Sequence, residues 1–219
     1  MKGLLIKDFK LMKNNMMFLV LVIFISVACA VGMKNPFFAL GYATVMTSIF
    51  SVNTIAYDEY DNGMPYLFSL PVTRKMYVKE KYVFAILISV VGVTIEMMIA
   101  VGVSLFLGEQ YRFTEGMGIL ALSLFFIILV QGITLPVRMR FDAEKHKMAM
   151  PIIFCAMAVA VVGVVFLLEQ VCGIDLDTFF ERLLITKAWI TFTIVIVIGI
   201  VLMYISYTMS VSFLRKREF

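Results

Sequence analysis

Six long, uninterrupted apolar runs constrain this chain more than any other feature of its sequence. They cover residues 16–33, 36–57, 82–107, 117–137, 149–168 and 188–210. Each is about as long as the roughly 20 helical residues needed to cross the hydrocarbon core of a bilayer. None alternates like a strand of a membrane barrel, and backbone groups in lipid must be bonded within their own segment. The runs therefore predict an all-α membrane protein with six transmembrane helices.

The composition agrees with a membrane location. The 219 residues are 62% hydrophobic and only 16% charged, whereas soluble domains are about half apolar and a quarter charged. The longest connections between the runs, residues 58–81 and 169–187, are too short to form a domain of their own. We therefore predict a single membrane domain over residues 1–219.

The basic residues predict the orientation of the helices. Four of them precede the first run, four separate the second run from the third, four separate the fourth from the fifth, and three follow the sixth. The other side holds only Lys34, Arg112, Arg182 and Lys187. The positive-inside rule then places both termini in the cytoplasm. Topology accounts for the net positive charge, so the bilayer is the expected partner and nucleic acid is not.

Residues 2–13 have the pattern of an amphipathic helix that lies in the headgroup layer, an elbow before the first span. Leu5, Phe9, Met12 and Met16 fall at helical spacing on one side, and the lysines fall elsewhere. The alternative interpretation is a basic flank that only orients the first span.

Catalytic and cofactor motifs are absent from the sequence. The one histidine, His146, lies in a charged loop, so the usual ligands cannot assemble a metal cluster. No G-x-x-x-x-G-K-[ST] phosphate loop occurs. We expect no cofactor in this chain and no enzymatic activity of the chain by itself.

The connection between the second and third spans has unusual chemistry for a linker. Gly63 and Pro65 can open a short helix, Pro71 would end it, and Thr73 is a plausible N-cap for the third span, which would then begin at Arg74. The short helix carries Tyr66, Leu67, Phe68 and Leu70. An apolar patch with charged residues around it is typical of a partner site. The alternative is that Leu67 and Phe68 dip into the membrane interface.

Three stretches of the sequence resemble the small bacterial ABC transporter permeases of the type-2 exporter family. The first is Ala56-Tyr57-Asp58-Glu59 with residues 67–74, the second is Leu135-Pro136 with residues 140–145, and the third is residues 206–210 with the basic tail. They occur in the family's order and cover most of the chain. One departure is Asp142, where the family usually has glycine.

The resemblance implies an exporter in the bacterial plasma membrane, in which two permease chains, identical or related, form the pathway. Separate ATPase subunits would bind ATP and Mg²⁺ and dock on the cytoplasmic loops, and the short helix would be the coupling helix. Implied ATPase-coupling residues are Asp58, Glu59, Tyr66, Leu67, Phe68, Leu70, Pro71 and Arg74. The substrate expected first from the family's range is an amphipathic or antimicrobial peptide.

Glu96 lies near the middle of the third span, where a carboxylate is costly unless it is paired, protonated or facing water. With Asn53 and Gln131 it is the candidate lining of a translocation pathway, and Thr94 is a further polar neighbour. Glu96 could equally bond a neighbouring helix as part of the packing. Two other functions stay open on the sequence: a stand-alone channel or ion-coupled carrier that uses Glu96, and a membrane scaffold or immunity protein.

Overall fold

The computed structural model describes residues 1–32, 52–60, 63–108, 113–141 and 188–217, with a few isolated positions between 46 and 48 and between 149 and 167. Within these ranges all regular structure is helical, as predicted. The labelled helices are α1 (Lys2–Asn14), α2 (Met16–Gly32), α4 (Gly63–Ser69), α5 (Arg74–Leu107), α6 (Phe113–Arg140) and α9 (Ala188–Lys216). Residues 52–59 are also helical.

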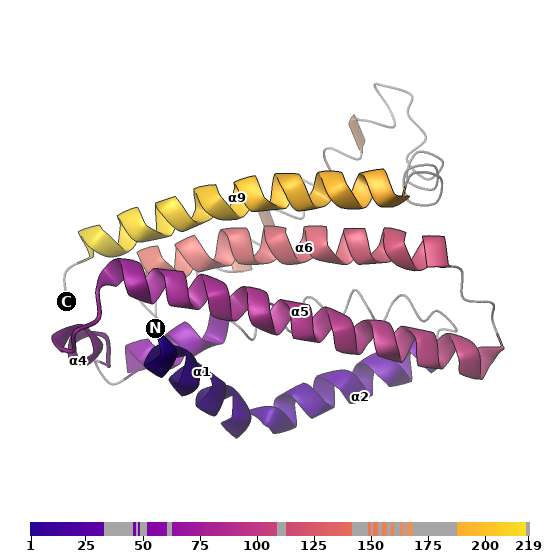
Figure 1. Cartoon of the computed structure of the whole chain (residues 1–219), viewed down its shortest axis with the longest axis horizontal. Coiled ribbons are helices and arrows are strands. Elements are labelled where there is room, and N and C mark those ends of the chain that lie inside the picture. Colours follow the sequence, from indigo (N-terminus) through magenta and orange to yellow (C-terminus); the bar gives the residue numbers. More distant parts are fainter. Residues whose placement is uncertain are drawn as a thin grey trace.

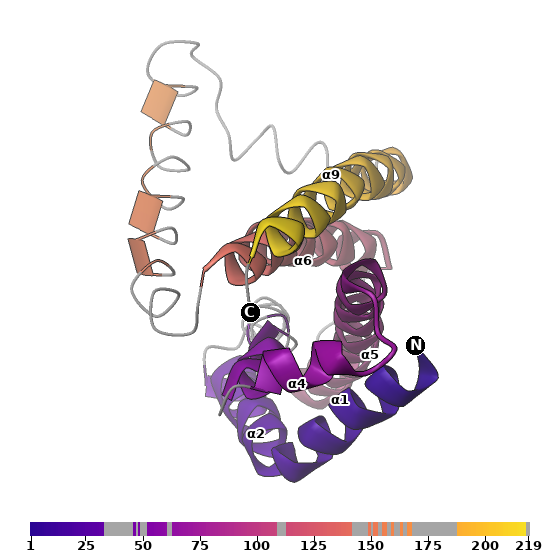
Figure 2. The same cartoon turned by 90° about the vertical axis from the view of Figure 1, so that its left-hand side faces the viewer.

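The three longest helices lie side by side. Figure 1 shows α5, α6 and α9 along the long axis of the molecule, with the short α4 at the end where α5 begins and α9 finishes. Viewed from that end, α4 and α1 cross the bundle on the side of α5, away from α9 (Figure 2). The α4 end therefore collects the start of α5 and the finish of both α6 and α9.

Among the described residues, α5, α9 and residues 123–140 of α6 are long and apolar enough to cross a membrane. A fourth candidate arises if α1 and α2, which meet at an angle of 61°, count as one bent span. The predicted class, a helical membrane protein, is thus supported, whereas the count of six spans is not confirmed. Two predicted spans, 36–57 and 149–168, lie mostly outside the described residues, and the predicted topology of the termini stays a prediction.

The local structure around α4 follows the sequence signals. The short helix predicted near residue 64 is present, and Thr73 caps α5 by accepting a hydrogen bond from the Met76 amide at 3.2 Å. A Cβ at Gly63 would lie 2.6 Å from the Asp58 carbonyl oxygen. Only glycine therefore lets the chain fold back so closely onto the segment before it.

The buried apolar core lies at the α4 end. Its members come from residues 52–60, α4, α5, α6 and α9: Val52, Ile55, Met64, Leu67, Tyr77, Val78, Tyr82, Ala85, Leu135, Met139, Val211 and Leu214. In contrast, only 11% of the most apolar stretch of α9 is buried. The remaining apolar surface of α9 suits contact with lipid, in which it need not be hidden.

A polar contact joins α6 to α9 where α6 contains a proline. Pro136 has no amide N–H, so the carbonyl of Gly132 one turn earlier loses its usual partner within the helix. The Ser206 hydroxyl of α9 donates to that carbonyl at 2.7 Å. The single hydroxyl proton of Ser206 is used in this bond. Ser206 therefore accepts from the Tyr82 hydroxyl at 2.6 Å, and Tyr82 in turn accepts from Ser210 at 2.8 Å. The proline thus creates the acceptor that fixes α9 on α6.

A double-mutant cycle tests this contact. In the wild-type background, Ser206→Ala is expected to lower the free energy of unfolding by about 1 kcal/mol, because the Gly132 carbonyl is left without its donor. In a Pro136→Ala background the restored amide can bond that carbonyl, so the same change should cost clearly less. Denaturant unfolding of the detergent-solubilised chain measures both costs. Equal costs in the two backgrounds would contradict this account.

Candidate functional site

Two adjacent acidic residues, Asp58 and Glu59, end the helical segment that precedes α4 and enter two separate groups of ion pairs. The Asp58 group reaches α1 and α5, and the Glu59 group reaches α6 and the segment after α9. We call the two groups together the ion-pair junction. Its members are Lys7, Asp8, Asp58, Glu59, Tyr77, Lys81, Arg138 and Arg217.

Asp58 is bonded from three directions. Its Oδ2 lies 2.8 Å from the Lys81 ammonium and accepts a hydrogen bond from the Tyr77 hydroxyl at 3.0 Å. Its Oδ1 pairs with Lys7 of α1. Burial alone would raise the pKa of Asp58, but the positive charges of Lys81 and Lys7 outweigh it and hold that pKa below its ordinary value. Asp58 is therefore an ionised carboxylate that joins three segments.

Asp8 attaches α1 to α5 by pairing with the same lysine, Lys81. Its side chain is fully buried, and its Oδ2 lies 2.5 Å from Nζ of Lys81. The Lys81 side chain is only 1% exposed, so its charge is balanced by the two carboxylates rather than by water. Lys81 also donates to the Thr54 hydroxyl at 3.3 Å. A buried lysine with all of its donors used in this way fixes three elements at once.

Glu59 makes the second group of pairs. One oxygen lies 2.9 Å from the Arg138 guanidinium near the end of α6, and the other lies 2.8 Å from Arg217, just after α9. The Glu59 and Arg138 side chains are 5% and 6% exposed. The carboxylate therefore ties the end of the helical segment at residues 52–59 to the ends of two of the long helices.

Arg74 makes a further set of contacts at the same end of the molecule. Its guanidinium donates to the carbonyls of Leu214 and Arg215 at 3.1 and 2.7 Å, carbonyls of the last turn of α9 that have no partner within the helix. It also lies 5.9 Å from the centre of the Phe68 ring. Arg74 thus links α4, the first turn of α5 and the last turn of α9.

The residues of α4 divide into an anchoring face and an outer face. Leu67 is 8% exposed within the core, and the Phe68 ring meets the Tyr77 ring edge-on at 5.8 Å. Tyr66 and Leu70 are 72% and 47% exposed, and Pro71 is exposed beside them. The exposed apolar surface here therefore consists of Pro65 and Tyr66 of α4 with Leu70 and Pro71 directly after it, not of the whole helix.

Sequence reasoning missed Asp8, Tyr77, Lys81, Arg138 and Arg217 as members of a site. It counted the basic ones only as charges that flank spans. A usable signal existed, because Asp8 is the only acidic residue among residues 2–13. An acid among lysines on an otherwise amphipathic helix calls for a buried partner.

The three candidate pathway residues lie at different places. Glu96 is buried and lines a narrow cavity between α2 and α5, among apolar residues such as Val22 and Ile95. Gln131 is buried between α6 and α5, donating to the Ala85 carbonyl at 3.2 Å and lying 2.5 Å from the Ser89 hydroxyl. Asn53 is exposed beside Asn15. The described structure does not bring these side chains together, and the pathway stays a prediction.

Comparison with known proteins gives the family. The model of the ABC-2 family transporter proteins matches residues 3–215, nearly the whole chain. The chain belongs to this family, and it is accordingly the permease, the non-catalytic membrane subunit, of an ABC transporter. No match was found among curated proteins or solved structures.

The Asp58 carboxylate can be tested by its pH dependence. Asp58→Asn removes the charge between two lysines, and we expect a loss of about 3 kcal/mol in the free energy of unfolding at pH 7. The folded-state pKa lies below the ordinary aspartate value of 3.8, so the stabilisation is fully present above that pH and disappears as the pH falls through the folded-state pKa.

The difference in stability between wild-type and Asp58→Asn chains should therefore be full at neutral pH, begin to narrow below about pH 4, and close only as the pH falls through the lower folded-state pKa. Melting temperatures of both chains in detergent across this range measure the gap. Other carboxyl groups titrate equally in both chains, so the gap isolates Asp58. A gap of constant size would show that the carboxylate charge is not what stabilises the junction.

Proposed function

We propose that the chain works as the membrane subunit of an ATP-driven exporter and that α4 is the helix through which a separate ATPase moves it. ATP and Mg²⁺ belong to the ATPase in this proposal, and a second permease chain, identical or related, completes the pathway in the bacterial plasma membrane. Family membership supports the role of membrane subunit. The division of α4 into a buried face and an exposed face supports its role as the coupling helix.

The observation that carries the proposal is the position of α4 on the ion-pair junction. Its outer face offers Tyr66 and Leu70, while Met64 and Leu67 are buried in the core shared by α5, α6 and α9. The segment just before it, at Asp58 and Glu59, is ionically bonded to four parts of the chain. A force applied to the outer face of α4 would reach the three long helices through the core that Met64 and Leu67 share with them.

The internal contacts change the roles that the sequence suggested for the charged coupling residues. Asp58, Glu59 and Arg74 all bond groups of their own chain. We propose that they transmit movement from α4 to the spans and that direct ATPase contact is made by Tyr66, Leu70 and Pro71.

The proposed cargo is an amphipathic peptide. The cavity beside Glu96 and the one beside Gln131 are lined almost wholly by apolar side chains, with a single polar group in the first and two in the second. Surfaces of this kind suit a partly apolar substrate better than a small ion.

Two sets of substitutions on α4 separate ATPase contact from anchoring. Tyr66→Ser with Leu70→Ser should abolish co-purification of the ATPase and leave the melting temperature of the permease unchanged, because both side chains are exposed. Leu67→Ser should lower the melting temperature, because it places a hydroxyl in the core.

Phe24→Ser on α2 is the matched control, since Phe24 is also an exposed apolar side chain and does not line the groove formed by Tyr66 and Leu70. It should retain the ATPase. If the Tyr66 and Leu70 variant binds the ATPase and transports as the wild type does, α4 is not the coupling helix.

Glu96→Gln tests the pathway. The change keeps the size of the side chain and removes its ability to ionise, so we expect export by the reconstituted complex to fall while the ATPase stays bound. Thr94→Val is the control, because Thr94 is exposed and its hydroxyl donates, within the described part of the chain, to the Val90 carbonyl of its own helix at 2.7 Å. Peptide uptake into inverted vesicles measures both. Normal export by Glu96→Gln would assign Glu96 to packing.

A further inference from the structure

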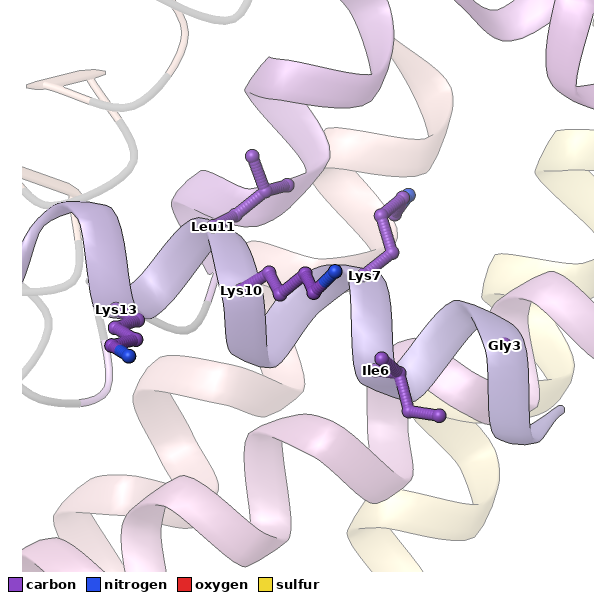
Figure 3. Close-up of a pocket in the computed structure, with 6 residues that line it drawn as sticks. All are labelled: Gly3, Ile6, Lys7, Lys10, Leu11 and Lys13. Carbon is purple, nitrogen blue, oxygen red and sulfur yellow. The ribbon is translucent and has the colours of Figure 1, made fainter.

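The outward face of α1 carries a basic surface that the coupling role of the molecule does not use. A depression on this face is lined by Gly3, Ile6, Lys7, Lys10, Leu11 and Lys13. In Figure 3 the Lys10 side chain runs along the helix toward Lys7, and Lys13 follows one turn later. Lys10 and Lys13 are exposed, and Lys7 is one-third exposed.

The charges of this face are of one sign. The only acid of α1, Asp8, is fully buried on the opposite side of the helix, where it pairs with Lys81. Lys7 already pairs with Asp58 and stands at the edge of the depression. Lys10 and Lys13 have no ion pair among the described residues. Within the described structure, the exposed charges of Lys10 and Lys13 are therefore not neutralised by a protein carboxylate.

Apolar side chains lie immediately beside these lysines. Ile6, which lines the depression, is 58% exposed, and Met17 at the start of α2 is 87% exposed. The angle of 61° between α1 and α2 turns α1 across the end of an apolar helix, as at the surface of a membrane. A ligand that fits both features has an anionic head next to an apolar tail.

We propose that this face binds the headgroup of an anionic phospholipid, with Lys10 and Lys13 contacting the phosphate and the acyl chains covering Ile6 and Met17. Such a lipid holds α1 at the membrane surface. Because α1 is bonded to Asp58 through Lys7 and to α5 through Asp8, the bound lipid also stabilises the ion-pair junction. The site does not depend on the proposed ATPase contact.

The test uses the full chain in nanodiscs of phosphatidylcholine, with and without an equal part of phosphatidylglycerol. Phosphatidylglycerol should raise the melting temperature of the wild type. Lys10→Gln with Lys13→Gln should lose most of this shift, since two lysines at an anionic surface account for about a thirtyfold difference in affinity. In phosphatidylcholine alone the variant should melt with the wild type, which shows that it folds.

Lys75→Gln with Lys79→Gln is the matched control, because it removes the same charge from exposed positions near the start of α5. It should keep the shift. Glycerol phosphate added to phosphatidylcholine nanodiscs should produce none. The proposal fails if the wild type shows no shift, if both double variants lose it equally, if the α1 variant keeps it, or if free glycerol phosphate reproduces it.

Discussion

The arrangement at the α4 end depends on one buried lysine held between two carboxylates. Lys81 lies almost fully out of water between Asp8 and Asp58, and a charge so placed is tolerable only because both partners are within ion-pair distance. The two acids come from α1 and from the segment before α4, so the requirement to neutralise one ammonium group fixes three elements. Removing any member would leave another buried charge with fewer partners.

The neighbouring Glu59 extends this constraint to the rest of the molecule. Successive residues of a helix point in different directions, so Asp58 and Glu59 face different partners although they are adjacent in sequence. Through Asp58 the helical segment at residues 52–59 is tied to α1 and α5, and through Glu59 it is tied to Arg138 and Arg217. In the proposed mechanism these ion pairs let α4 move together with the long helices.

Three motif stretches that are far apart in sequence meet at this end. Residues 56–74 supply the two acids and α4, and Pro136 leaves the Gly132 carbonyl of α6 without a partner in its helix. Ser206 donates to that carbonyl, and both Ser206 and Ser210 bond the Tyr82 hydroxyl. Each contact satisfies a polar group that lipid and core cannot satisfy.

The sequence alone determined the class of the protein. The apolar runs require helices in lipid, and Gly63, Pro65 and Thr73 encode α4 and the start of α5, because these signals act over a few residues of chain. The described ranges agree with the predicted helices at 2–13, 16–33, 82–107, 117–137 and 188–210. Family membership agrees with the resemblance seen in the motifs.

Only the tertiary structure decided how the charges are used. Asp8 and Lys81 are 73 residues apart and Glu59 and Arg217 are 158 apart, and no local pattern tells a lysine that flanks a span from one that is buried beside an acid. The same holds for α4, where packing buries Leu67 and leaves Tyr66 outside. Ion pairing and burial are properties of surfaces brought together by the fold, whereas helix formation and membrane partition are properties of the local chain.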